Sequence, residues 1–472
     1  MNKKTLTFIK NMSYAISSNI ITLIISTLVI LVLPKILGVE DYGYLQLYLF
    51  YCAYVGFLHF GWNDGIYLRY GGAEYFNLNK RLFFSQFLML TSSQLLIGSL
   101  IWLFTGILNA SVGYSFIIRM VAISMVIVNI RIMLVYILQI TNRIKEYARI
   151  TIIDRVTYII LVIILLFFGI DNYKVIVFAD LIGKLLSLMY SMYCCRDIVF
   201  CKMNSFYISI SETISNISVG IKLMLANFAS LLIIGIVRFG IERNWDITTF
   251  GKISLTLSIS NLLMVFINAI GIILFPMLRR TSVKNLPKIY LTLRIIITIP
   301  MFGLLIFYYP LKLALSAWLP NYVESFTYMA LLFPMCVYEG KMALLINTYL
   351  KTLRKEKMIL IINLATVVLS LLLTLLFTIL FKDLLIITLS IVVLLAFRCI
   401  LAEVLLSKVL NVKIINNIIQ EVIMVICFIL TAWFLTFWIG FMTYILSYCI
   451  YLFIRKSKVI QTVKHVKEIS RS

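Results

Sequence analysis

Basic side chains inside long apolar segments are the residues of this sequence with the clearest chemical potential. Lys222, Arg131 and Arg398 each lie within a run of apolar residues. A charge inside a lipid bilayer is costly, and it usually marks a substrate or ion pathway. Ammonium and guanidinium groups in such a place would bind an anion, above all a phosphate. The structural alternative is that each reaches the membrane surface or pairs with an acid on another helix. Arg119 and Arg294 are expected nearer the interfaces.

Polar side chains also recur at helical spacing along three of the apolar segments, and each set falls on one face of its helix. The first segment carries Asn11, Tyr14, Ser18, Thr22 and Ser26. The seventh carries Asn216, Gly220, Asn227, Ser230 and Arg238, and the eighth carries Ser254, Ser258, Asn261 and Asn268. Such stripes could bind sugar hydroxyls in a cavity. Small polar residues also provide close packing and hydrogen bonds between membrane helices.

Acidic side chains are rare inside the apolar segments. Asp180 and Lys184 are four residues apart, the spacing at which opposite charges on one helix neutralise each other. Asp64 and Glu339 are candidates for a proton or sodium site. Glu339 follows Pro334, where a break in the helix could expose backbone carbonyls.

Nothing in the sequence predicts a catalytic group, a metal site or a cofactor. The cluster Cys194, Cys195 and Cys201 has no CxxC pair and no nearby histidine, so a zinc site is not expected. The only histidines are His59 and His465. An integral-membrane glycosyltransferase or polysaccharide polymerase would need catalytic acids or histidines on a sizeable outer loop. We therefore expect a protein that is not an enzyme.

The elements that must position these side chains are membrane-spanning helices. The chain has 472 residues, of which 62% are hydrophobic and 13% are charged, and its mean hydropathy is +1.04. Soluble domains are about 25% charged, so a soluble or disordered protein is excluded. A spanning helix needs about 20 apolar residues, and about 14 such segments fit. We therefore predict an all-α integral membrane protein with about 14 transmembrane helices.

The net charge of +23 reflects the orientation of these helices rather than a nucleic-acid partner. With 14 spans, 28 of the 42 basic residues fall on one side of the membrane and 7 on the other. Lysine and arginine concentrate on the cytoplasmic loops of membrane proteins. The distribution therefore predicts a multi-pass protein of the plasma membrane with both termini in the cytoplasm.

Two matching patterns indicate an internal duplication. Residues 11–16 open the first span and residues 216–221 open the seventh; an acidic stretch and an aromatic–glycine pair follow each span. An even number of spans in each half makes the halves parallel, with the substrate site between them. We expect a six-helix bundle over residues 1–205, a second over 206–412, related to the first by pseudo-two-fold symmetry, and two extra helices with a basic tail over 413–472.

Several segments of the sequence match the motifs of one known family. They are Leu33–Tyr44 (LPKILGVEDYGY), Gly61–Gly65 (GWNDG), Arg69–Gly71 (RYG), Gln139–Tyr147 (QITNRIKEY), Phe250–Gly251, Phe275–Pro276 and Asn347–Leu350 (NTYL) with Lys355. Together these segments resemble the bacterial O-antigen and capsule repeat-unit flippases of the multidrug/oligosaccharidyl-lipid/polysaccharide exporter superfamily. The resemblance covers nearly the whole chain. In one departure, Val237 precedes Arg238, where relatives often carry an acid.

The resemblance implies two six-helix bundles around a central cavity lined by helices 1, 2, 7 and 8. The substrate would be an undecaprenyl-diphosphate-linked oligosaccharide, carried from the cytoplasmic to the outer leaflet by alternating access for surface polysaccharide synthesis. Membrane lipid would contact the protein, and the polymerase and glycosyltransferases of the pathway would be its partners. The expected substrate-binding residues are Lys222, Arg131, Arg398, Asn216, Asn227, Arg238, Ser18, Thr22, Asn261, Asn268 and Arg69.

Three other substrate classes stay open. A flippase for lipid II or a teichoic-acid precursor would need the same lipid-diphosphate chemistry. A multidrug exporter of the superfamily would share the fold, but cationic substrates call for acids in the cavity. In this sequence, basic residues outnumber acidic ones within the apolar segments, which favours an anionic substrate.

Overall fold

Helices joined by short loops account for almost all of the computed structural model, which describes residues 3–107, 111–279 and 285–469. Side chains are described in these ranges except at 3–12, 15–16, 263, 265–279, 457–459 and 461–469. Twelve helical segments of the described chain are long and apolar enough to cross a bilayer. The chain is therefore an all-helical, multi-pass membrane protein, as predicted.

Two of the 14 segments expected from the sequence, one around Tyr51 and one around Leu263, are not among these twelve. The first is broken into several short helices. The second lies on α10 (Ile247–Arg279), whose side chains are not described at residues 263 and 265–279.

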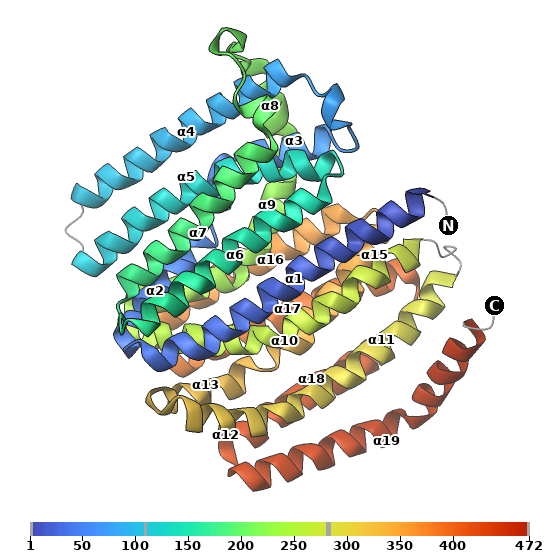
Figure 1. The fold of residues 1–472 in the computed structure, drawn as a ribbon. Helices are drawn as coiled ribbons and strands as arrows, with labels where there is room; N and C mark the ends of the chain where they lie inside the picture. The colour runs from blue at the N-terminus through green and yellow to red at the C-terminus, as the bar shows by residue number, and fades with distance from the viewer. Residues whose placement is uncertain (1–2, 108–110, 280–284, 470–472) are drawn as a thin grey trace. The chain divides into compact units, whose positions relative to one another are not determined.

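The chain forms two compact units, Met1–Phe228 and Ala229–Ser472, and the division falls within α9 (Ile210–Asn244) (Figure 1). Unit 1 also holds α1 (Lys3–Ile36), α2 (Val39–Cys52), α3 (Trp62–Arg69), α4 (Lys80–Ile107), α5 (Val112–Ile140), α6 (Ile144–Phe167), α7 (Tyr173–Cys194) and α8 (Arg196–Val199). Unit 2 also holds α10, α11 (Leu286–Leu304), α12 (Tyr308–Trp318), α13 (Ser325–Leu332), α14 (Met335–Lys341), α15 (Asn347–Thr352), α16 (Glu356–Leu376), α17 (Leu384–Leu410), α18 (Ile415–Phe434) and α19 (Phe437–Ile469).

The second predicted span of unit 1 is interrupted in its middle. After α2, a 3₁₀ turn at Val55–His59 leads to Phe60 and Gly61, which both have positive φ. The imidazole Nδ1 of His59 accepts a hydrogen bond from the backbone N–H of Gly61. Left-handed backbone ends the helical ladder, and α3 then begins at Trp62.

Side chains from α4 and α5 satisfy the backbone groups that this interruption leaves unpaired. The Asn129 amide donates to the carbonyl of Val55 at 3.0 Å, and the Gln94 amide donates to the carbonyl of Leu58 at 3.1 Å. Asn129 also donates to Gln94 at 2.7 Å. A bilayer offers no water to such groups, so the break depends on these two amides.

The first half of α9 packs against α3 with almost no space between the two backbones. A Cβ added to Gly220 would lie 1.9 Å from the carbonyl oxygen of Gly61, and one added to Gly65 would lie 1.9 Å from that of Asn216. Small residues allow membrane helices to approach this closely. The polar stripe predicted on the seventh span thus provides close packing along part of its length.

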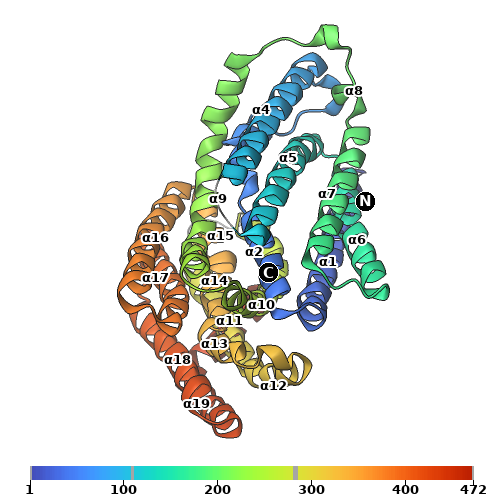
Figure 2. The same cartoon turned by 90° about the vertical axis from the view of Figure 1, so that its left-hand side faces the viewer.

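In unit 2, Pro334 ends α13 and separates it from α14, as the sequence indicated, and a π turn at Met342–Ile346 follows α14. α16 pairs with α17 (Figure 2), and α19 packs against both α18 and α11. The helices predicted as extra are therefore an integral part of unit 2.

The contact between α3 and α9 predicts a strong effect of a single methyl group. We expect Gly220→Ala to lower the thermal unfolding midpoint of the detergent-solubilised protein, at a cost of about 1–3 kcal/mol, because the backbones must separate. Gly38→Ala is the control, since nothing lies within 4 Å of a Cβ at Gly38. Equal midpoints for the two variants would contradict the close contact.

Candidate functional site

Two of the predicted substrate-binding residues, Arg69 and Asn216, meet where α3 contacts α9. The Arg69 guanidinium donates to the Glu212 carboxylate and to the Asn216 amide oxygen, both at 2.5 Å. The Tyr70 hydroxyl donates to Glu212 at 2.6 Å. Burial and this hydrogen bond raise the pKa of Tyr70 to about 12. Asn216 is fully buried and also donates to Gln86, so its side chain is occupied by protein groups.

Arg131 has an acidic partner on another helix, which was the structural alternative for this residue. Its guanidinium on α5 donates to the Asp154 carboxylate on α6 and to the Ser187 hydroxyl on α7, both at 2.6 Å. The pair is buried or nearly so. Arg131 therefore ties three helices of unit 1 together.

The predicted neutralisation of Asp180 by Lys184 is confirmed. The two side chains form an ion pair at 2.6 Å along α7, and both are buried. The Tyr48 hydroxyl donates to Asp180 at 2.7 Å, and Lys184 donates to the Ser124 hydroxyl at 3.0 Å. Both charges are thus satisfied inside unit 1.

Arg398 and Glu339, predicted as a substrate-binding residue and an ion-coupling residue, contact each other in unit 2. The guanidinium on α17 donates to the Glu339 carboxylate on α14 at 2.9 Å. It also donates to Asn363 on α16 at 2.9 Å and to Ser230 on α9 at 2.8 Å. Arg398 is 3% exposed, whereas the Glu339 side chain is 23% exposed. Glu339 is thus the carboxylate that balances Arg398 among the described residues, and it is the more exposed member of the pair.

Lys222 differs from all of these cations. It lies on α9, about 18 Å along the axis from the first residue of the helix. Its side chain is exposed and has no hydrogen-bond or ion-pair partner in the described part of the chain. Asn227 is also exposed and lies on the same helix. Lys222 is thus available to an anion, as Arg131 and Arg398 are not.

The other predicted residues are dispersed. Ser18 is buried and its carbonyl accepts a bond from the Thr22 hydroxyl at 2.9 Å. Arg238 donates to the Ser254 hydroxyl at 3.0 Å. Asn261 is exposed, and Asn268 lies outside the described side chains. Asp64 is buried in the first turn of α3, with its carboxylate 3.7 Å from the His59 imidazole.

A network of four buried charges in unit 2 was missed by the sequence analysis. Arg294 on α11 pairs with Glu403 on α17 and Glu421 on α18, each at 2.7 Å. Lys341 on α14 pairs with Glu421 at 2.6 Å and also with Glu403. All four residues are at most 5% exposed. Arg294, which was expected near an interface, is instead enclosed by protein.

This network joins the C-terminal helices to the rest of unit 2. Arg455 on α19 lies 3.9 Å from Glu421 and donates to Gln420 at 3.1 Å. The Tyr290 hydroxyl donates to Glu403. A signal was present in the sequence: Glu403 and Glu421 are single acids inside apolar helices, which is costly unless each is paired.

No group of His, Cys, Asp and Glu in the described residues has the arrangement of a metal site. No protein-family profile matches the sequence, and no curated protein matches it. Several solved structures do. The lipid II flippase MurJ in an inward closed conformation has a TM-score of 0.65 at 14% identity, over 96% of this chain and 100% of that one.

An inward-facing multidrug resistance transporter of the MATE family, which belongs to the MOP superfamily, has a TM-score of 0.61 at 12% identity, over 87% of this chain and 98% of that one. A eukaryotic MATE transporter has a TM-score of 0.51 at 15% identity, over 88% and 98%. The fold is similar to that of these transporters. The structural neighbours are transporters and not enzymes. The resemblance noted in the sequence is therefore supported at the level of the fold.

The buried network predicts that removing one charge destabilises the protein more than removing one charge of each sign. We expect Glu403→Gln to destabilise the protein by about 3–5 kcal/mol, because Arg294 and Lys341 then share a single carboxylate. Adding Lys341→Met restores the charge balance and should recover part of the loss. Thermal unfolding in detergent measures both. Glu356→Gln, at an exposed first turn, is the control, and a loss no larger at Glu403 would contradict this reading.

Proposed function

We propose that this protein translocates an undecaprenyl-diphosphate-linked oligosaccharide from the cytoplasmic to the outer leaflet by alternating access, for surface polysaccharide synthesis. The observation that carries the proposal is Lys222, which is exposed inside a spanning helix and has no partner among the described residues, in a fold similar to that of the lipid II flippase MurJ. An ammonium group there would bind the diphosphate of such a lipid. No catalytic group is needed, because no covalent bond changes.

The extent of the structural likeness favours a lipid substrate over a drug. The match to the lipid II flippase covers 96% of this chain, so it must include most of the C-terminal pair α18 and α19. The match to the multidrug transporter covers 87% of this chain and need not include that pair. The C-terminal pair, held by Glu421 in the buried network, is thus part of the likeness to the lipid transporter.

The charge balance supports the same choice. In the described helices, the acids Asp154, Asp180, Glu403 and Glu421 are each paired with a lysine or arginine. Asp64 has no such partner, but it is buried beside His59. A cationic drug would need a free acid that is exposed, whereas an anionic lipid needs a free base. A flippase for lipid II or a teichoic-acid precursor meets the same requirement and is the second candidate.

We assign direct contact with the diphosphate to Lys222 and contact with a sugar hydroxyl to Asn227, because both side chains are exposed. Arg398, Arg131 and Arg69 would reach the substrate only if their present pairs opened. Glu339 and Asp64 remain the coupling candidates. Movement of Glu339 away from Arg398 would leave the guanidinium without its carboxylate partner, although Asn363 and Ser230 would still accept hydrogen bonds from it.

We further propose 14 spans, obtained by adding the interrupted α2–α3 segment and α10 to the twelve apolar segments. Both termini would then lie in the cytoplasm, with the protein in a bacterial plasma membrane. The bundles 1–205 and 206–412 and the C-terminal segment 413–472 remain our proposed domains. Pathway glycosyltransferases and the polymerase remain proposed partners.

The proposal predicts a specific role for Lys222. In vesicles containing the purified protein and a fluorescent undecaprenyl-diphosphate-linked oligosaccharide, we expect Lys222→Ala to slow translocation about tenfold or more, because a hydrogen-bonded charge pair with phosphate is lost. Lys222→Arg should retain most of the rate, since it keeps the charge.

Lys174→Ala is the matched control, because Lys174 is a cation in the first turn of α7. Its rate and the thermal midpoint of all variants should equal those of the unmodified protein. An undiminished rate for Lys222→Ala would remove the argument for an anion site on α9.

The 14-span arrangement predicts where the chain ends lie. Reporter fusions at Asn142, Leu353 and the C-terminus should all report a cytoplasmic location, whereas fusions at Gly169 and Asp383 should report the outer side. An external C-terminus would overturn the even number of spans.

A further inference from the structure

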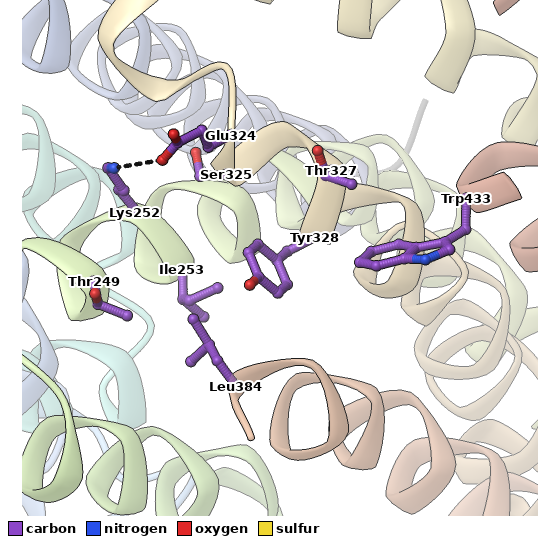
Figure 3. A pocket seen from close by; sticks show the side chains of 9 residues that line it. All are labelled: Thr249, Lys252, Ile253, Glu324, Ser325, Thr327, Tyr328, Leu384 and Trp433. Atoms are coloured by element: carbon purple, nitrogen blue, oxygen red, sulfur yellow. Dashed lines mark hydrogen bonds and ion pairs between the residues drawn. The ribbon is translucent and has the colours of Figure 1, made fainter. Parts of the chain in front are cut away.

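A pocket of about 430 Å³ opens at one end of unit 2, and none of the residues predicted from the sequence lines it (Figure 3). Its walls come from the first turns of α10, α13 and α17 and from the last turn of α18. Among the described residues of unit 2, a basic loop follows α15 at Arg354 and Lys355, and another follows α17 at Lys413, at the end of α17 opposite the pocket. Its volume lies in the lower part of the range of small-molecule sites, about 300–1,000 Å³.

The pocket is lined by an aromatic wall. Tyr328 of α13 and Trp433 of α18 meet edge to face, with ring centroids 6.1 Å apart. Both side chains are only partly buried, so ring surface remains accessible. The C–H face of a sugar ring carries a slight positive charge and packs against the negative face of an aromatic ring. The wall therefore suits a sugar.

Unpaired polar groups surround this wall. The Thr327 and Tyr328 hydroxyls and the Trp433 indole N–H line the pocket, and none of the three has a hydrogen-bond partner among the residues that the structure describes. Hydroxyls both donate and accept, and the indole only donates. This mixture matches the hydroxyl groups of a saccharide, each of which is itself a donor and an acceptor.

The charges of the pocket cancel. Lys252 and Glu324 are its only charged lining residues, and their side chains form an ion pair at 3.3 Å (Figure 3). The Glu324 side chain is 88% exposed, so its second oxygen is free to accept from a ligand hydroxyl. A balanced pair gives no net attraction for a phosphate, in contrast to Lys222.

We propose that this pocket binds an uncharged saccharide, with the sugar ring against Trp433 and Tyr328 and its hydroxyls bonded to Glu324 and Thr327. The site is separate from the anion-binding residues of α9 and would recognise sugar at the end of unit 2 away from the basic loops. It would contact the sugar part of a lipid-linked saccharide or a free oligosaccharide by the same groups.

The test is saturation-transfer NMR on the full-length protein in detergent with maltotriose, chitotriose and mannotriose as probes, and with excess inorganic pyrophosphate as a competitor. We expect at least one trisaccharide to bind with a dissociation constant in the millimolar range, and we expect its signal to be unchanged when pyrophosphate is added. Trp433→Ala and Glu324→Gln should each weaken saccharide binding about tenfold or more.

Trp438→Ala is the control, because Trp438 is an exposed tryptophan near the start of α19 that does not line the pocket. Equal loss in this variant would mean that both tryptophans only anchor the protein at the membrane surface, and would overturn the proposal. Thr327→Val, which keeps the side-chain shape, replaces Trp433→Ala if that variant does not fold.

No binding by any trisaccharide, binding that survives either pocket variant, or competition by pyrophosphate would each overturn the saccharide site. The experiment requires no transport. Saccharide binding without translocation of the lipid-linked oligosaccharide would therefore support this site and overturn the proposed function. Translocation without saccharide binding would support the proposed function and overturn this site.

Discussion

A lipid bilayer does not hydrate charges, so each charged side chain within this protein must be balanced by another side chain or by a bound molecule. The four-residue network of Arg294, Lys341, Glu403 and Glu421 is the most enclosed example. It joins α11, α14, α17 and α18. Each of its four charges would be costly to bury without the others. Unit 2, including its C-terminal helices, depends on this network.

The same constraint distinguishes intramembrane groups that are bonded to other protein groups from those that are free to bind a ligand. Where α2 is interrupted, amide side chains replace water at the freed carbonyls. Where Arg131 enters the apolar interior, Asp154 accompanies it. Lys222 has no such partner among the described residues. This cation is therefore a position where an anionic substrate would contribute binding energy.

The sequence was informative about the helices and less so about their side-chain partners. Apolar length located the spans, and the i,i+4 spacing of Asp180 and Lys184 predicted their pairing, because both signals are local. Arg294 and Glu403 are more than a hundred residues apart, so no local pattern could join them. The polar stripe on α9 was visible, yet its spacing could not tell the packed Asn216 from the exposed Asn227, since that difference depends on what lies opposite. The pocket beside Trp433 comes from four helix ends and had no sequence signal.

Substrate charge is the central claim of this account, and a transport comparison tests it most directly. Vesicles containing the purified protein would be loaded in parallel with a fluorescent undecaprenyl-diphosphate-linked oligosaccharide or with a cationic dye of the kind that multidrug exporters move. The account predicts translocation of the lipid, inhibited by soluble pyrophosphate-linked sugar, and no movement of the dye. Movement of the dye without movement of the lipid would contradict it.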